Sequence, residues 1–296
     1  MQWPVAACLC FAFALNSKAQ TSPITTSMRP SSGVEIVQVS VNGTGPYPFV
    51  LDTGANVSMV KRSLLRELKV PVAGAMVLVA SLGESLHERA ELHSVSLSGL
   101  SVQDVEVSTL EGPELGSIQE QVQGILGENF LEQFDLLIDN DKQLLVLDQT
   151  PQLENSLTGE HLPISRSGIS NASDTAHRIF VPLKLPDVLT RPVLFLLDSA
   201  ANAAMLYPLK NELPVVKGRA HYGSIHSLSS DQQCRVEHTA FDIGSDRYRE
   251  IVLATCEGMT RDATDTDGLL PTSLFHRLFI CHRKGYVIAN PRTVLR

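Results

Sequence analysis

Apolar and polar residues alternate with a period of two along most of the chain, which is typical of β-strands with one buried face. Residues 34–41 alternate in this way and end at Asn42-Gly43, a dipeptide that favours a two-residue hairpin turn. Residues 95–107 alternate likewise, and two apolar runs within 134–147 flank a polar turn. We therefore expect the first half of the chain to consist largely of hairpins.

The second half has a similar hairpin pattern at 278–288, and helical patterns are short throughout. They are limited to 61–68 and to 129–133, the second of which follows a Gly-x-x-Gly turn. Closely spaced strands with few helices favour a small barrel or a folded sheet. The pattern therefore predicts an all-β fold.

The chain contains one repeat that spans about half of its length. One apolar run leads into Asp-Thr-Gly-Ala-Asn at 52–56, and another leads into Asp-Ser-Ala-Ala-Asn at 198–202. Gly-Ile-Leu-Gly at 124–127 and Gly-Leu-Leu-Pro at 268–271 follow these motifs at nearly the same separation. Two motifs in the same order and at matched spacing indicate two pseudo-symmetric β-barrel lobes.

A repeat of this length indicates two lobes, because solenoid repeats are much shorter. We place the lobes at residues 28–148 and 178–296. The segment between them, 149–177, is rich in Ser, Thr, Pro, Asn and Gly and is expected to be a linker.

The composition is that of a globular protein, with 43% apolar and 19% charged positions among 296 residues. A formal net charge of -8 argues against nucleic acid as a partner, because phosphate binding needs a basic surface. No stretch reaches about 18 uninterrupted apolar residues, so no membrane-spanning helix is expected. We expect a monomer.

The N-terminus has the pattern of a targeting segment. Residues 3–15 are apolar but too short to span a bilayer, and Ser17-Lys18-Ala19 has the small-x-small form of a cleavage site. We predict a signal peptide over residues 1–19, cleaved near Ala19, and hence a periplasmic or secreted location. Met1-Gln2 lacks the usual positive charge, and a buried N-terminal helix or strand is the alternative.

Removal of residues 1–19 would leave three cysteines, Cys234, Cys256 and Cys281. An odd number allows at most one disulfide and leaves a free thiol. None has Cys-x-x-Cys spacing or belongs to a cluster with histidine, so we expect no metal and no cofactor.

Asp52 and Asp198 are the candidate catalytic residues, because each follows the apolar strand of one repeat. Core-type residues flank Asp52, and a buried carboxylate is costly unless it has a partner. If the lobes face each other about a pseudo-two-fold axis, the two turns meet and the carboxyls share one proton. The ionised member can then take a proton from a water while the protonated member polarises a carbonyl group.

The segment from Phe49 to Ala55 resembles the active-site turn of the aspartic peptidases, the pepsin-like and retropepsin-like enzymes. The stretch from Gly124 to Leu131 resembles their downstream apolar-glycine element and is similar to that of bacterial two-lobed members. This resemblance covers both lobes. It implies an aspartic endopeptidase that binds a peptide or protein substrate in extended conformation in the cleft between the lobes.

The resemblance also implies roles for the residues that follow each aspartate. Thr53 and Ser199 would hydrogen-bond across the lobes and hold the turns rigid, and Gly54 and Ala200 would complete the turns. Ala200 departs from the family motif, which has Gly there. Glycine in such a turn marks a close approach or a φ that a Cβ penalises.

Displacement of the second carboxyl by about 1 Å would cost on the order of a hundredfold in rate. A catalytically impaired peptide-binding protein on the same fold is therefore the alternative function. A glycosidase, which also uses two carboxylates, is a weaker alternative, because its acid and base normally lie in unlike environments.

Ala55 and Ala201 occupy positions where pepsin-like members often have a hydroxyl residue that donates to the carboxylate. Loss of this donor is expected to raise the pKa values of the pair, so we predict a less acidic pH optimum than that of the gastric enzymes. Family members also fold a hairpin over the cleft. The resemblance places this flap at Ser81, Leu82 and Gly83, without the tyrosine that pepsin-like enzymes usually have.

Overall fold

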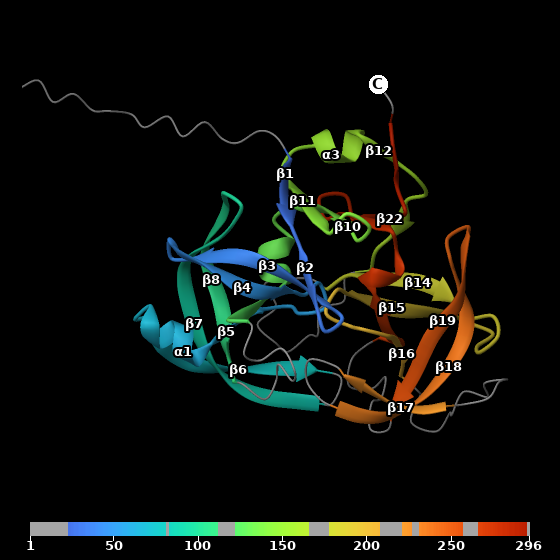
Figure 1. Ribbon diagram of the computed structural model, residues 1–296, viewed down its shortest axis with the longest axis horizontal. Helices are drawn as coiled ribbons and strands as arrows, with labels where there is room; N and C mark the ends of the chain where they lie inside the picture. Colours follow the sequence, from blue (N-terminus) through green and yellow to red (C-terminus); the bar gives the residue numbers. More distant parts are fainter. Residues whose placement is uncertain are drawn as a thin grey trace, which may run out of the picture.

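The structure is a computed structural model that describes residues 23–80, 83–111, 122–165, 178–207, 221–226, 231–256 and 266–294. Strands make up most of these residues, and the helices are short. Figure 1 shows two β-rich lobes, the first in blue to green and the second in yellow to orange, with a sheet that lies across them at one end. The predicted all-β, two-lobed fold is confirmed.

The first lobe is an eight-stranded sheet in the order β2-β3-β4-β9-β5-β8-β7-β6. A further pairing of β3 with β7 closes the strands from β3 to β7 in this order into a barrel. Short helices α1 and α2 follow β5 and β9. The bounds are β2 Arg29–Ser31, β3 Val34–Val41, β4 Thr44–Leu51, β5 Ser58–Lys61, α1 Arg62–Glu67, β6 Val72–Ala80, β7 Gly83–Leu97, β8 Leu100–Leu110, β9 Gly124–Leu126 and α2 Glu128–Leu131.

The second lobe is a seven-stranded sheet in the order β14-β15-β20-β16-β19-β18-β17. This order repeats the first lobe strand by strand from β3 to β6, and a pairing of β14 with β18 closes the second barrel. The bounds are β14 Phe180–Lys184, β15 Pro192–Asp198, β16 Ala204–Leu206, β17 His221–His226, β18 Asp231–Ile243, β19 Asp246–Cys256, β20 Gly268–Pro271 and the 3-10 helix η3 Thr272–Leu274.

A six-stranded sheet, β1-β11-β10-β21-β22-β13, joins the lobes. The two hairpins expected from the sequence lie side by side at its centre, because β10 pairs antiparallel with β21. All five residues of β10 are buried, which explains its continuous apolar run. The bounds are β1 Ile24–Ser27, β10 Asp135–Asp139, β11 Leu144–Asp148, β13 Leu162–Pro163, β21 Arg277–Cys281 and β22 Tyr286–Ala289.

The segment predicted as a linker, 149–177, has ordered elements in its first part. Helix α3 Gln152–Asn155 is followed by β12 Leu157–Thr158, which pairs with β23 Arg292–Thr293, and by β13 of the joining sheet. Residues 166–177 and the predicted signal peptide, 1–19, lie outside the described residues. None of the helices that the structure describes has the length and apolar character needed to cross a membrane.

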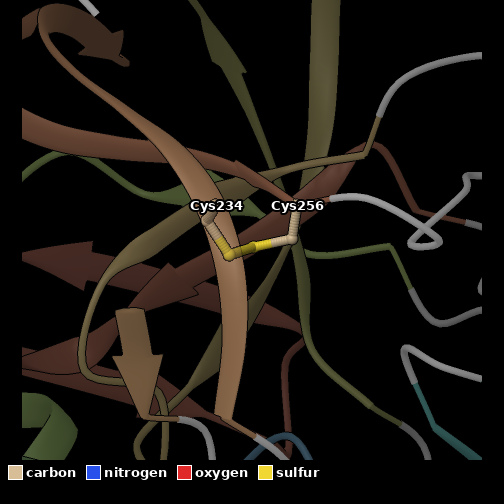
Figure 2. The surroundings of a disulfide bond; sticks show 2 residues. All are labelled: Cys234 and Cys256. Carbon is tan, nitrogen blue, oxygen red and sulfur yellow. A yellow bond between two sulfur atoms is a disulfide. The ribbon is translucent and has the colours of Figure 1, made fainter. Parts of the chain in front are cut away.

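A disulfide joins two strands of the second barrel. Cys234 of β18 and Cys256 of β19 lie directly opposite each other and are bonded (Figure 2). Cys281 of β21 is a buried free thiol. This agrees with the expectation of one bridge at most and one free thiol among these three cysteines.

Gly124 and Gly268 lie at equivalent places, where β9 and β20 enter the middle of each barrel. A Cβ at Gly124 would overlap the Phe49 ring and the carbonyl oxygen of Met59. A Cβ at Gly268 would overlap the Phe195 ring and the carbonyl oxygen of Met205 in β16, which is equivalent to Met59. Glycine is needed at both places because the neighbouring backbone is too close for a side chain.

Replacement of Gly124 or Gly268 by alanine is expected to destabilise the protein by about 2 kcal/mol or more, because the carbonyl in the way belongs to a paired strand. Urea unfolding measures the change. Gly43→Asn is the control: no atom lies within 4 Å of its added Cβ, and asparagine tolerates the φ of 75° there. Equal losses in all three variants would contradict this explanation.

Candidate active site

Asp52 follows β4 and is held at the start of a tight turn. Its N–H donates to the carbonyl oxygen of Leu126 in β9 at 3.0 Å, so the parallel pairing of β4 with β9 fixes its backbone. The N–H groups of Gly54 and Ala55 donate to Asp52 Oδ1 at 2.8 and 3.1 Å. The residue is 9% exposed.

Asp198 has the same arrangement at the end of β15, opposite Pro271 of β20. The N–H groups of Ala200 and Ala201 donate to Asp198 Oδ1 at 2.8 and 3.0 Å. The two turns therefore have the same hydrogen bonds to their carboxylates, although their sequences differ at the second and third positions.

Four buried hydrogen bonds tie the turns to each other across the lobes. The Thr53 N–H donates to Ser199 Oγ at 3.0 Å, and the Ser199 N–H donates to Thr53 Oγ1 at 3.1 Å. The Thr53 hydroxyl donates to the carbonyl oxygen of Leu197 at 3.0 Å, and the Ser199 hydroxyl donates to that of Leu51 at 2.8 Å. This is the cross-lobe contact that the resemblance implies for Thr53 and Ser199.

The carboxyl of Asp198 faces the turn of the first lobe. A Cβ at Gly54 would lie 2.8 Å from Asp198 Cγ, so glycine is needed there because the second carboxyl approaches the first turn. Ala200 does not have a positive φ. It is 6% exposed and packs in an apolar cluster that includes Val34 and Val50 of the first lobe.

Burial is the main cause that raises the pKa of Asp52 well above its ordinary value of 3.8, and the charge of Asp198 acts in the same direction. Glu128 adds a smaller effect of the same sign. The N–H groups of Gly54 and Ala55 oppose these effects, because they stabilise the ionised form.

Burial also raises the pKa of Asp198, against the opposing effects of the Ala200 and Ala201 N–H groups and of the Arg178 charge. Two adjacent carboxyls with raised pKa values favour a state in which the pair holds one proton. The charged neighbours differ, because Asp52 has an acidic neighbour and Asp198 a basic one.

The flap prediction falls partly outside the described residues, because Ser81 and Leu82 lie there. Gly83 is the first residue of β7 and pairs with Ala80 of β6, so a β-hairpin does turn at this point. Figure 1 shows β6–β7 and β17–β18 at the end of the molecule opposite the joining sheet. Placement of the flap over a bound peptide stays a prediction.

Three residues near the aspartates were missed by reasoning from the sequence: Arg178, Glu128 and His282. Glu128 is fully buried and directly follows the Gly-x-x-Gly element, which is the signal that could have marked it. Arg178 and His282 are also buried, but each is an isolated residue in the sequence, and no motif connects either to an aspartate.

One acidic cluster among the described residues has the spacing of metal ligands: Asp135, Glu154 and Cys281. The protein's own cations occupy it, since Arg283 Nε donates to Asp135 Oδ2 at 2.7 Å and Lys284 Nζ to Glu154 Oε1 at 2.5 Å. Burial raises the pKa of the Cys281 thiol to about 11, so this sulfur stays protonated. The cluster is therefore an internal ion-pair network.

A polar cavity of about 300 Å³ lies elsewhere on the second lobe, between the segment after α3 and the β18–β19 turn. Glu160 at its edge accepts hydrogen bonds from Ser245, and none of the predicted site residues lines it.

Thr53→Val and Ser199→Ala are each expected to lower stability by about 1 to 3 kcal/mol, because each leaves a buried N–H and a buried carbonyl of the other turn without a partner. Chemical unfolding of the single and double variants measures this. Because all four bonds hold the same two turns together, we expect the double variant to lose less than the sum of the singles. Additive losses would show that the two hydroxyls act independently.

Asp52→Asn keeps the oxygen that accepts the turn hydrogen bonds but cannot ionise. Because the folded state raises the pKa of Asp52, it binds this proton more tightly than the unfolded chain does. That stabilisation is complete below about pH 3.8 and is lost as the pH rises through the raised value.

We therefore expect the Tm of Asp52→Asn to exceed that of the wild type near pH 7 and the difference to shrink towards pH 3.5. Thermal unfolding over a pH series measures it. Asp141→Asn, which replaces an exposed carboxylate, should give no such trend. A difference that grows on acidification would contradict the raised pKa.

The family model described as aspartyl protease matches residues 37–130, which include the Asp52 turn and the Gly124–Gly127 element. Among solved structures, the chain is similar to the crystal structure of a retropepsin-like aspartic protease from Rickettsia conorii. The identity is 25%, the match covers 43% of this chain and 89% of that chain, and the TM-score is 0.33. A comparison with curated proteins found no match.

The family match and the motif agree on the same first turn, and the second lobe repeats the strand order of the first. Residues 37–130, which form most of the first lobe, match the aspartyl protease family.

Proposed function

We propose that the protein is an aspartic endopeptidase that hydrolyses peptide bonds with a water activated by Asp52 and Asp198. One observation supports this above the others: two equivalent turns from different lobes are hydrogen-bonded to each other, and the Asp198 carboxyl lies against the Asp52 turn. This is the geometry in which two carboxyls share a proton between them.

The neighbours of the two carboxyls favour one location of the shared proton. Arg178 lowers the pKa of Asp198, whereas Glu128 adds to the effects of burial and of Asp198 that raise the pKa of Asp52. Asp52 therefore holds the proton and donates a hydrogen bond to the carbonyl oxygen of the scissile bond. Ionised Asp198 takes a proton from the attacking water.

Attack of this water gives a tetrahedral intermediate whose oxygen receives the Asp52 proton. The proton taken by Asp198 then passes to the leaving amine as the C–N bond breaks. Asp52 recovers its proton when the carbonyl re-forms, so both carboxyls return to their starting state. This reaction does not require a covalent intermediate with the enzyme.

The substrate class that fits this fold is a peptide in extended conformation. Strands β6 and β17 are at the free ends of the two lobe sheets, and an edge strand can pair with an added extended chain. Specificity for side chains would come from residues on either side of the turns.

The alternative of an impaired peptide-binding protein rests on Ala200. Two observations favour activity: Ala200 has no positive φ, and its N–H reaches Asp198 Oδ1 at 2.8 Å, the distance that Gly54 has to Asp52. The methyl group is buried in a packed apolar cluster. The alanine is therefore compatible with the turn geometry of the glycine in the first lobe.

We also propose a periplasmic or secreted location. The Cys234–Cys256 disulfide supports this, because such bonds persist in oxidising compartments and are rare in the cytosol.

Incubation with a mixed peptide library, with and without pepstatin, tests the activity. Asp52→Asn and Asp198→Asn should each lower kcat/KM by about a hundredfold or more, whereas Asp141→Asn should retain activity. Because the pKa values of both aspartates are raised, we expect the optimum above about pH 3.

Ala200→Gly separates the two functions. Cleavage by the wild type that changes little in Ala200→Gly supports an active enzyme. Binding without cleavage in the wild type, with cleavage restored in Ala200→Gly, would replace the proposal by the impaired alternative. Cleavage unchanged in both aspartate variants would disprove the dyad.

A further inference from the structure

A buried histidine–glutamate pair joins the lobes behind the Asp52 turn. His282 Nε2 lies 3.0 Å from Glu128 Oε2, and His282 Nδ1 lies 2.6 Å from the carbonyl oxygen of Phe134. Glu128 is 0% and His282 is 6% exposed. Glu128 belongs to the first lobe, and His282 follows β21, a strand that the second half of the chain contributes to the joining sheet, so the contact connects the two halves of the chain.

The geometry requires one proton between these two side chains. A carbonyl oxygen only accepts hydrogen bonds, so Nδ1 carries a hydrogen. The short Nε2–carboxylate contact then needs a second hydrogen, which resides on the imidazole or on the carboxyl. In either case the pair has no net charge, and a fully buried carboxylate is spared the cost of an unpaired ion.

Among the described residues, the equivalent positions on the other side of the pseudo-two-fold axis hold a neutral contact instead. Asn140 is the first residue after β10, as His282 is after β21, and Thr272 follows its Gly-Leu-Leu-Pro element as Glu128 follows Gly-Ile-Leu-Gly. The Asn140 Nδ2 donates to the carbonyl oxygens of Thr272 and Phe275 at 2.9 and 2.8 Å. A neutral amide on one side thus corresponds to two ionisable groups on the other.

The pair is connected to the first catalytic turn through the backbone. The Glu128 N–H donates to the carbonyl oxygen of Ala55 at 2.8 Å, and the Ala55 N–H donates to Asp52 Oδ1. The charge of Glu128 also acts on Asp52 and raises its pKa. Glu128 therefore acts on the Asp52 turn in two ways, through a backbone hydrogen bond and through the charge of its side chain.

We propose that His282 and Glu128 are positioning residues for the catalytic pair, and that the proton they share limits the negative charge presented to Asp52. This inference rests on the proposed function for its kinetic consequence. It makes the two halves of the site unequal, since the His282–Glu128 support on the Asp52 side can titrate and the equivalent Asn140–Thr272 contact is neutral.

Other charged groups surround the pair and are part of its setting. Asp52 faces it from the catalytic turn, and Glu132 lies one helical turn along α2. Asp135 of β10 and Arg283, next to His282, form an ion pair with each other. The charges of Asp135 and Arg283 cancel each other. Glu128 is therefore the acidic neighbour of Asp52 whose charge depends on His282.

Two substitutions should move the site in opposite directions. Glu128→Gln removes the negative charge near Asp52. Asp52 and Asp198 therefore lose the proton that they share at a lower pH than in the wild type. His282→Gln removes the positive charge, but its amide still donates a hydrogen bond that favours ionised Glu128. The aspartates then keep their proton to higher pH.

The experiment measures kcat/KM over a pH series for the wild type, Glu128→Gln, His282→Gln and the matched control Asn140→Ala. At a pH on the basic limb, we expect Glu128→Gln to be about threefold or more below the wild type and His282→Gln to be above it, after scaling each to its own optimum. Asn140→Ala removes the neutral hydrogen bonds at the equivalent place and should not shift the basic limb of the kcat/KM profile along the pH axis.

A second readout does not need catalysis. The carbon-13 carboxyl resonances of the catalytic aspartates, titrated in the same variants, should move to lower pH in Glu128→Gln and to higher pH in His282→Gln. Lower stability in both variants with unmoved titrations would show a purely structural pair and overturn the inference, as would shifts of the same sign. If the wild type cleaves no peptide, the proposed function fails, and the titrations still decide this inference.

Discussion

The reciprocal hydrogen bonds of Thr53 and Ser199 determine where the two carboxyls lie. Each hydroxyl accepts from the facing turn and donates to the strand end of the facing lobe, and all four bonds are buried. A buried polar group that loses its partner costs more than the bond itself contributes, because no water replaces it. The turns therefore have one fixed relative position, and this position also fixes how the two barrels lie relative to each other.

Holding the turns together brings two acidic groups into a dry setting, which opposes folding. Paired N–H donors on each Oδ1 reduce this cost, and the one shared proton that we propose would remove the repulsion between the carboxyls. The remaining cost of burial is tolerated because paired strands on both sides, β4 with β9 and β15 with β20, fix the backbone. The candidate site therefore lowers stability locally, and the surrounding sheets compensate for this loss.

Much of the architecture could be read from local pattern. The alternation over 34–41 corresponds to β3, the hairpin signals at 134–147 and 278–288 correspond to the joined hairpins, and the repeat corresponds to the shared strand order. The segment 149–177 was expected to be a plain linker, yet its first part forms α3, β12 and β13. Those short elements depend on partners elsewhere, such as β22 and β23, and have almost no period of their own.

The sequence by itself determined the all-β class, the duplication and the two aspartate turns, because alternation and turn chemistry are properties of neighbouring residues. Only the tertiary structure decided that Ala200 fits its turn, that Cys234 pairs with Cys256, and that His282 supports Glu128. The last two residues are 154 positions apart. Contacts of that kind arise when the lobes pack, and no periodicity along the chain encodes them.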